Sequence, residues 1–170
     1  MFLLTNLRAL CALTVIASVS LLGAAYYFEL VMELEPCPMC IMQRIVVLAI
    51  GLIALITLVH NPKSFTGKKV YASLAGLTSL AGIAISIRHS WIQAFPPEDI
   101  PSCGAPLEYM IEIMPFQEVL TAMLSGTASC TDVSWNFLGL TMPNWMIIVF
   151  ICYGIFSALL WRSKNVDKSL

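Results

Sequence analysis

Residues 41–59 read IMQRIVVLAIGLIALITLV, an apolar run long enough to cross a lipid bilayer. A membrane-spanning helix needs about 17–25 mostly apolar residues, and at about 1.5 Å per residue this run reaches roughly 28 Å. Similar runs cover residues 10–28, 70–87 and 145–161. Helices are expected because an open strand would leave backbone groups unsatisfied in lipid. The sequence therefore predicts an all-α membrane protein, a four-transmembrane-helix bundle that forms a single domain over residues 1–170.

The first run, residues 10–28, has a competing interpretation as a cleavable signal peptide. It is longer than the roughly 7–15 apolar residues of a signal-peptide core, and further spans follow it. We therefore expect it to remain as a membrane helix.

The composition of the chain agrees with a membrane environment. Of 170 residues, 59% are hydrophobic and 11% are charged, the mean hydropathy is +0.85 and the formal net charge is −1. Soluble domains are typically about 45–50% apolar and about 25% charged. These values exclude an ordinary cytosolic enzyme, a disordered chain and a basic nucleic-acid-binding protein. The lipid bilayer is an expected partner, and nucleic acid is not.

The basic residues predict the orientation in the membrane. Most of the nine Lys and Arg residues flank the spans on one side: Arg8, Lys63, Lys68, Lys69, Arg162, Lys164 and Lys168. The positive-inside rule makes this side cytoplasmic. Both termini are then expected in the cytoplasm, with outward loops near residues 29–40 and 90–143; these loops would be periplasmic in a bacterial inner membrane.

The second of these loops carries an amphipathic pattern. Apolar side chains are interleaved with Glu108, Glu112 and Glu118 at close to helical spacing, although Pro115 is expected to bend or interrupt a helix there. We predict a short amphipathic helix along the membrane surface.

Two arginines depart from the charge pattern. Arg44 and Arg88 lie at the outward ends of the second and third spans. An arginine in the apolar zone costs about 2.5–3.5 kcal/mol on insertion scales, so it usually snorkels to the interface or faces a partner. An interfacial anchor and a functional cation both fit these positions.

The six cysteines divide into two groups by this topology. Two lie within spans, where a thiol packs as a small apolar residue: Cys11 and Cys152. Four lie on the outward side: Cys37, Cys40, Cys103 and Cys130. Because disulfides persist outside the cytoplasm, this second group suggests either redox chemistry or structural staples.

Cys37-Pro-Met-Cys40 is a C-x-x-C motif where the first outward loop enters the second span. A helix N-terminus or a nearby cation lowers the pKa of a thiol and favours the reactive thiolate. Arg44 lies one turn after Cys40 on the same helix face, where it could hold a thiolate or an electron-rich oxygen. A static disulfide and a metal site with Cys103 and Cys130 are the alternatives. Because the sequence has no second close cysteine pair, we predict no metal.

Cys103 and Cys130 most simply pair with each other across the long loop. A structural staple of this kind would stabilise the fold by about 3–4 kcal/mol. A reactive bond would instead exchange with a partner thiol through a mixed disulfide. The sequence leaves both uses open.

The residues from Cys37 to Arg44, CPMCIMQR, resemble the C-x-x-C-x-x-(E/Q)-R signature of the DsbB disulfide bond formation proteins of bacterial inner membranes. The segment from Trp135 to Trp145 is similar to the one that leads into the fourth span of that family. Gln43 stands where many members have glutamate. The four-span topology and the pair of loop cysteines fit as well, so the resemblance covers nearly the whole chain.

The resemblance implies a path for electrons. Cys103 and Cys130 match the loop disulfide that accepts electrons from a reduced DsbA-type partner, with Cys103 as the site of the mixed disulfide. Cys130 would then exchange with Cys37 and so reduce the Cys37–Cys40 pair. Cys40 matches the thiol that reacts with a bound quinone, either ubiquinone or menaquinone.

Two further residues match the quinone site of the family. Arg44 corresponds to the residue that supports the quinone oxygen and the thiolate. His89, at the end of the third span, corresponds to a histidine placed near the quinone. On the sequence alone, His89 is equally well an interfacial residue.

We therefore expect a quinone-linked protein-disulfide oxidoreductase of the bacterial inner membrane, which oxidises a periplasmic DsbA-type thiol oxidoreductase and draws on the membrane quinone pool. Making a disulfide from two thiols needs an acceptor for two electrons, and a lipid-soluble quinone is available at a membrane. One alternative is a non-catalytic tetraspan scaffold with disulfide-stapled loops. Another is a DsbB relative or a VKOR-like enzyme that serves a different partner.

Overall fold

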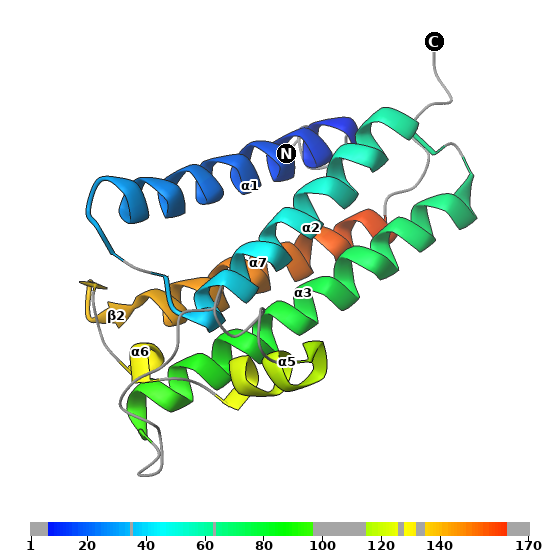
Figure 1. The fold of residues 1–170 in the computed structure, drawn as a ribbon. Coiled ribbons are helices and arrows are strands. Elements are labelled where there is room, and N and C mark those ends of the chain that lie inside the picture. Colours follow the sequence, from blue (N-terminus) through cyan, green and yellow to red (C-terminus); the bar gives the residue numbers. More distant parts are fainter. Residues whose placement is uncertain are drawn as a thin grey trace.

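The computed structural model describes residues 7–34, 36–62, 64–96, 115–125, 128–131 and 135–162. Its four long helices alternate in direction, so that the start of the first and the end of the last lie at the same end of the bundle (Figure 1). Their bounds are Leu7–Leu30 (α1), Pro38–His60 (α2), Phe65–Ala94 (α3) and Met142–Arg162 (α7). All four are long and apolar enough to cross a membrane, which confirms the predicted four-helix bundle.

Each helix extends past the apolar run that predicted it, and α3 does so most. It covers 30 residues and continues well beyond residue 87, where the apolar run ends. A helix need not stop where the chain becomes more polar, because its backbone hydrogen bonds continue without lipid. The extension carries His89 and Gln93 to the end of the bundle at which α2 begins. We call this end, which holds Cys37, the cysteine end.

The helices pack in a defined order, with α2 between α1 and α3, and α3 along α7. Gly82 of α3 faces the ring of Phe150 on α7 so closely that an added Cβ would lie 2.5 Å from its Cδ1 atom. Small residues allow membrane helices to approach each other in this way. The close contact of α3 and α7 therefore depends on a glycine.

Side-chain hydrogen bonds also join the helices. Ser79 donates from Oγ to the main-chain oxygen of Phe150 at 2.6 Å, and Ser157 donates from α7 to the main chain of α3 at 2.7 Å. The hydroxyls of Ser18 on α1 and Tyr153 on α7 lie 2.8 Å apart. Bonds of this kind contribute on average about 0.6 kcal/mol between membrane helices, where lipid offers no hydrophobic drive for association.

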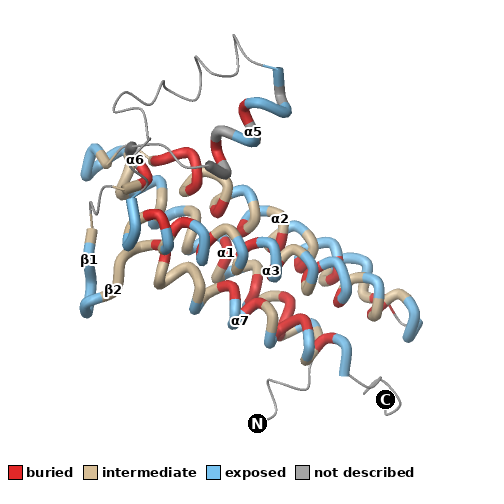
Figure 2. The backbone as a smooth tube through the Cα atoms, turned by 90° about the horizontal axis from the view of Figure 1, so that it is seen from below, coloured by how far each residue is buried: buried red, intermediate tan, exposed pale blue. Residues whose placement is uncertain are grey.

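The outer surface of the bundle is apolar. Buried residues follow the sides of the helices that face one another, and exposed residues follow the outer sides (Figure 2). Large apolar side chains occupy many exposed positions, among them Leu13, Ile16, Leu52, Leu77 and Ile155. A surface of this kind suits contact with lipid chains.

A short amphipathic helix, α5 (Phe116–Ser125), lies in the second loop, as predicted. Its Val119 and Met123 are buried, and Glu118 is exposed. Pro115 lies directly before the helix, and its carbonyl oxygen accepts the N–H groups of Glu118 at 2.9 Å and Val119 at 3.2 Å. The earlier part of the amphipathic pattern, residues 107–114, lies outside the described residues.

An antiparallel hairpin before α7 is a feature that the sequence did not predict. Strand β1 (Asn136–Phe137) pairs with β2 (Leu140–Thr141), and Leu138 and Gly139 turn between them with φ angles of 54° and 79°. Two successive positive φ angles are typical of a type I′ turn, whose usual sequence is Asn-Gly or Asp-Gly. Leu-Gly carries no such signal, so local sequence patterns missed the hairpin.

Aromatic rings hold the hairpin against the bundle. The rings of Trp135 and Phe137 stack with their centroids 5.7 Å apart, and Trp145 donates from Nε1 to the main-chain oxygen of Phe137 at 3.2 Å. Trp135 also contacts Phe28 of α1, with centroids 5.7 Å apart. Tryptophan is enriched where membrane helices meet water, which suits this end of the bundle.

Gly82→Ala tests the packing of α3 on α7. The added methyl group cannot avoid the Phe150 ring, so we expect the free energy of unfolding in detergent to fall by about 1–3 kcal/mol. Gly23→Ala is the matched control, because nothing lies within 4 Å of a Cβ added there and alanine favours a helix. Thermal unfolding followed by circular dichroism checks both variants. Equal stability of the two would contradict the packing described here.

Candidate functional site

The two sulfurs of the C-x-x-C motif meet at the first turn of α2. Cys37 is the N-cap, with φ −66° and ψ 158°, and Pro38 opens the helix. Proline suits this position because it has a helical φ and lacks an N–H that would remain unbonded. The backbone N–H of Cys40 donates to Sγ of Cys37 at 3.3 Å, and the Cys37 thiol donates to Sγ of Cys40 at 2.9 Å.

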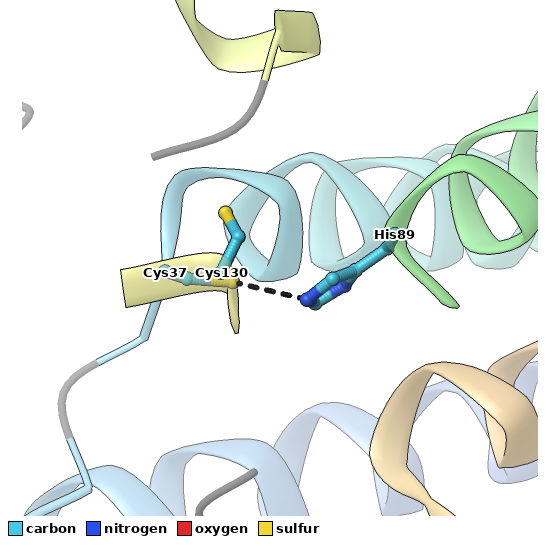
Figure 3. Close-up of side chains that lie close together, drawn as sticks. All are labelled: Cys37, His89 and Cys130. Atoms are coloured by element: carbon cyan, nitrogen blue, oxygen red, sulfur yellow. Dashed lines mark hydrogen bonds between the residues drawn. The ribbon is translucent and has the colours of Figure 1, made fainter. Parts of the chain in front are cut away.

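Two residues from other parts of the chain join Cys37. His89 comes from α3, and Cys130 comes from α6 (Ala128–Thr131), a single short turn of helix. Nε2 of His89 lies 3.6 Å from Sγ of Cys37, and the side chains of all three converge in Figure 3. Their Sγ and ring nitrogen atoms lie within 4.8 Å of one another, and all three residues are buried. We call Cys37, His89 and Cys130 the thiol–histidine cluster.

Gln43, which lies one turn after Cys40 in α2, orients the ring of His89. Its side-chain amide nitrogen lies 3.5 Å from Nδ1 of His89, and the side chain is buried. The oxygen and nitrogen of a glutamine amide are assigned from the hydrogen bonds around them. When the amide is rotated by 180°, its oxygen can accept a hydrogen bond from Nδ1–H of His89. In this tautomer of His89, Nε2 carries no proton and its lone pair faces Cys37.

The environment raises the pKa of the Cys37 thiol above its ordinary value. Its hydrogen bond with Cys130 is the largest cause, followed by its hydrogen bond with Cys40 and by burial. The sequence led us to expect a lowered thiol pKa at a helix N-terminus, so the structure reverses that expectation for Cys37. The reason is that Cys37 donates its proton to neighbouring sulfurs in a site with little water.

Arg44 has a partner that the sequence did not identify. Its guanidinium group forms an ion pair with Glu29 of α1 and donates to the main-chain oxygen of Ala25 at 3.2 Å. It also lies over the Tyr26 ring, 5.6 Å from the centroid. An arginine near the apolar zone signals a partner, but charge counting alone could not choose Glu29 among the outward acidic residues.

A cavity of about 210 Å³ opens between the helices beside the cysteines. Its wall is mostly apolar, with Phe28, Val47 and Met146 among the lining residues. The polar groups on the wall come from a few residues: Cys37, Cys40, Gln43, Arg44, His89 and Gln93. An apolar pocket with few polar groups is the usual form of a small-molecule site.

One polar atom in this wall has no protein partner among the described residues. Oε1 of Gln93 is buried and accepts no hydrogen bond from them. A buried polar group without a partner costs about 1–3 kcal/mol, so such an atom invites a ligand that carries a donor. The cavity therefore fits a largely apolar molecule with a few polar groups, one of them able to donate a hydrogen bond.

The structure thus brings together most of the residues that the sequence singled out. Cys37, Cys40, Arg44 and His89 line one cavity, and Cys130 contacts Cys37 beside it. Cys103 lies outside the described residues. The remaining cysteines lie in the membrane helices, as expected: Cys11, which is buried, and Cys152, which is exposed.

The exposed Arg88 is not among the residues that line the cavity. The contributions of Glu29, Gln43 and Gln93 were missed, because they depend on contacts between different helices.

Comparison with known proteins finds one family model and several relatives that carry the same name. The family model described as "Disulfide bond formation protein DsbB" matches residues 7–160. The chain is 46% identical over 158 residues to Disulfide bond formation protein B of Hahella chejuensis, covering 93% of this chain and 94% of the relative. It is 49% identical over 142 residues to the protein of that name from Methylococcus capsulatus, covering 84% and 86%. With the Stutzerimonas stutzeri protein it shares 43% over 164 residues, covering 96% and 99%.

The raised pKa of Cys37 predicts slow alkylation of this thiol in the reduced protein. A thiol with a raised pKa is mostly protonated near pH 8, and only the thiolate reacts with iodoacetamide. Mass spectrometry of the Cys37 peptide should show that the labelling rate increases only at a higher pH in the native protein than in the denatured chain. Cys130→Ala removes the largest cause of the shift and should move the profile toward lower pH. A native profile that matches the denatured one would contradict the hydrogen bonding described for Cys37.

Proposed function

The chain belongs to the DsbB family, and from this premise we propose that it oxidises a periplasmic DsbA-type thiol oxidoreductase and passes the electrons to a membrane quinone. The family and the four membrane-spanning helices make it a multi-pass inner-membrane protein of disulfide bond formation. We propose the identity of the electron donor, of the electron acceptor and of the residues that act between them.

One observation carries the proposal: Cys37 contacts both a cysteine of its own motif and a cysteine from a distant segment. Its thiol lies 2.9 Å from Sγ of Cys40, and it also hydrogen bonds with Cys130. A thiolate can exchange with a disulfide only when it reaches one of the two sulfurs directly. A static staple needs two cysteines, whereas three adjacent sulfurs suit the transfer of a disulfide from one pair to another.

The proposed exchange begins at Cys103. A thiolate of the reduced partner attacks Cys103 in the Cys103–Cys130 disulfide and releases Cys130. The second partner thiol then attacks the mixed disulfide, so that the partner leaves oxidised and Cys103 is a thiol. Cys130 attacks Sγ of Cys37, which breaks the Cys37–Cys40 bond and leaves Cys40 as a thiolate. The Cys103 thiolate then attacks Sγ of Cys130, which re-forms the Cys103–Cys130 disulfide and releases Cys37 as a thiol. Cys37 and Cys40 return to a disulfide only when two electrons and two protons leave them for an acceptor, and a membrane quinone would be that acceptor.

His89 is proposed to move protons in these exchanges. Its Nε2 lies 3.6 Å from Sγ of Cys37, close enough to accept the thiol proton with a small movement. Gln43 holds the opposite side of the ring at Nδ1. In this proposal His89 acts mainly on the sulfurs and only secondarily on a molecule in the cavity. The resemblance implies only a position near the quinone.

The cavity is the proposed place of electron exit. When bound there, a quinone supplies an acceptor for two electrons and two protons. Cys40 lines the cavity and presents its sulfur at the helix N-terminus, and Arg44 supplies hydrogen-bond donors on the same wall. The unpartnered Oε1 of Gln93 would accept a hydrogen bond from the reduced, hydroxyl-bearing form of the quinone. Arginine has five N–H donors, and Glu29 and Ala25 leave others available for an electron-rich oxygen. The guanidinium group would stabilise negative charge that develops beside it.

The orientation is part of the same proposal. The basic residues expected in the cytoplasm flank the end of the bundle opposite to the cysteines, with Lys69 near the start of α3 and Arg162 at the end of α7. The positive-inside rule then directs the cysteine end to the periplasm. A DsbA-type partner would approach the bundle from that side.

Quinone consumption tests the electron exit. The purified protein in detergent, supplied with a reduced DsbA-type protein, should consume ubiquinone or menaquinone, as followed by the loss of quinone absorbance. Cys40→Ser should lower the rate of quinone consumption at least 100-fold. Cys152→Ser is the control, because this cysteine is exposed on α7 away from the cavity and should retain full activity. A folded Cys40→Ser variant with undiminished quinone consumption would contradict the role of Cys40. No consumption by the folded wild type would favour the scaffold or another acceptor.

Trapping tests the electron entry. In a Cys130→Ser variant, the Cys103 thiol can attack the disulfide of the oxidised partner, and no Cys130 thiol remains to resolve the adduct. We expect a mixed disulfide to accumulate and peptide mapping to assign it to Cys103. The same variant with Cys103→Ala added should give no adduct. An adduct at Cys37 would show that the partner enters at the C-x-x-C motif instead.

A further inference from the structure

We propose that the reduced protein binds one Zn²⁺ ion in the thiol–histidine cluster, with Cys37, Cys130 and His89 as ligands and Cys40 as the fourth. This inference goes beyond the proposed function and does not depend on a quinone or a partner protein. It concerns a site that sequence spacing argued against, because the chain has no second close cysteine pair. The fold supplies the missing ligands from α3 and α6.

The ligand atoms lie at distances suited to a tetrahedral ion. With Zn–S of about 2.3 Å and Zn–N of about 2.0–2.1 Å, tetrahedral geometry places a sulfur and a nitrogen about 3.6 Å apart and two sulfurs about 3.8 Å apart. Sγ of Cys37 and Nε2 of His89 are 3.6 Å apart. The ligand atoms of Cys37, His89 and Cys130 all lie within 4.8 Å of one another. Movements of up to about 1 Å would therefore bring the three ligand atoms to this geometry.

Cys40 supplies the fourth ligand. Two cysteines separated by two residues are a common zinc-binding spacing, because one helical turn aims both sulfurs at one point. Sγ of Cys40 lies 2.9 Å from Sγ of Cys37, so a small rotation of the Cys40 side chain would open the distance that the ion needs. The resulting donor set has three thiolates and one imidazole, a composition typical of zinc sites.

Gln43 provides the support that metal-bound histidines usually have. A histidine that binds a metal through Nε2 carries its proton on Nδ1 and donates it to a nearby oxygen. The side-chain amide of Gln43 lies 3.5 Å from Nδ1 and can present its oxygen there. It is also buried, with 4% of its surface exposed, so water competes little for this contact.

The chemistry of binding involves protons and no electrons. Three thiols lose their protons to solvent as Zn²⁺ binds their sulfurs, and no group is oxidised or reduced. Sulfurs held by the ion cannot form the Cys37–Cys40 bond, so the metal would keep the cluster reduced. An oxidised Cys37–Cys40 pair offers no thiolates, and this form should not bind the ion.

The test titrates Zn²⁺ into the reduced full-length protein in detergent, in competition with a chromophoric chelator. We expect one ion per chain, affinity at least 100-fold weaker for Cys130→Ala and for His89→Ala, and no binding to the oxidised protein. Cys152→Ser is the control and should bind as the wild type does. Gln43→Ala should weaken binding by about 10–100-fold, and Gln43→Glu should restore it because a carboxylate can accept the Nδ1 proton.

Co²⁺ in place of Zn²⁺ reports the number of thiolate ligands directly, and its spectrum in the wild-type protein does not depend on any variant. The wild-type protein should show the visible absorption of tetrahedral cobalt with the charge-transfer intensity of three thiolates, and Cys40→Ser should lose one of them. Absence of a tetrahedral spectrum in the reduced wild type would overturn the proposal. So would Zn²⁺ binding that is unchanged in folded Cys130→Ala and His89→Ala variants.

Discussion

The start of α2 is the constraint on which the rest of the site depends. Pro38 permits the helix to begin at that point, and Cys37 caps it, so the first turn holds the two sulfurs of the motif 2.9 Å apart. The same turn lies at the boundary between the apolar span and the loop. Both sulfurs therefore stand where a group within the membrane and a segment outside it can reach them.

Packing between the other helices brings the remaining groups to that turn. α3 is held along α7 by Gly82 against Phe150 and by hydrogen bonds from serine hydroxyls, and α2 packs beside α3. Because interiors resist deformation, these contacts determine where the end of α3 lies. His89 and Gln93 reach the cavity only because α3 continues past its apolar run. A change in the bundle far from the cysteines can therefore affect the site.

Charge at the cysteine end is compensated within the protein. Arg44 would be costly in an apolar zone without a partner, and Glu29, Ala25 and Tyr26 of α1 all contact it. The pairing ties α1 to α2 beside the cavity and keeps a guanidinium group on its wall. As proposed, the thiol–histidine cluster would take part in disulfide exchange when oxidised groups are present and would bind a metal ion when all the thiols are reduced. Its redox state would decide between the two.

The sequence by itself determined the four spans, the short amphipathic helix of the second loop and the closeness of Cys37 and Cys40. Each of these depends on apolar length or on spacing within one helix, and such patterns are local. Only the tertiary structure decided that Glu29 pairs with Arg44, that His89 and Cys130 meet Cys37, and that Leu138 and Gly139 turn a hairpin. These features depend on how helices pack and how rings stack across the chain. No periodicity in the sequence encodes the distance between segments so far apart.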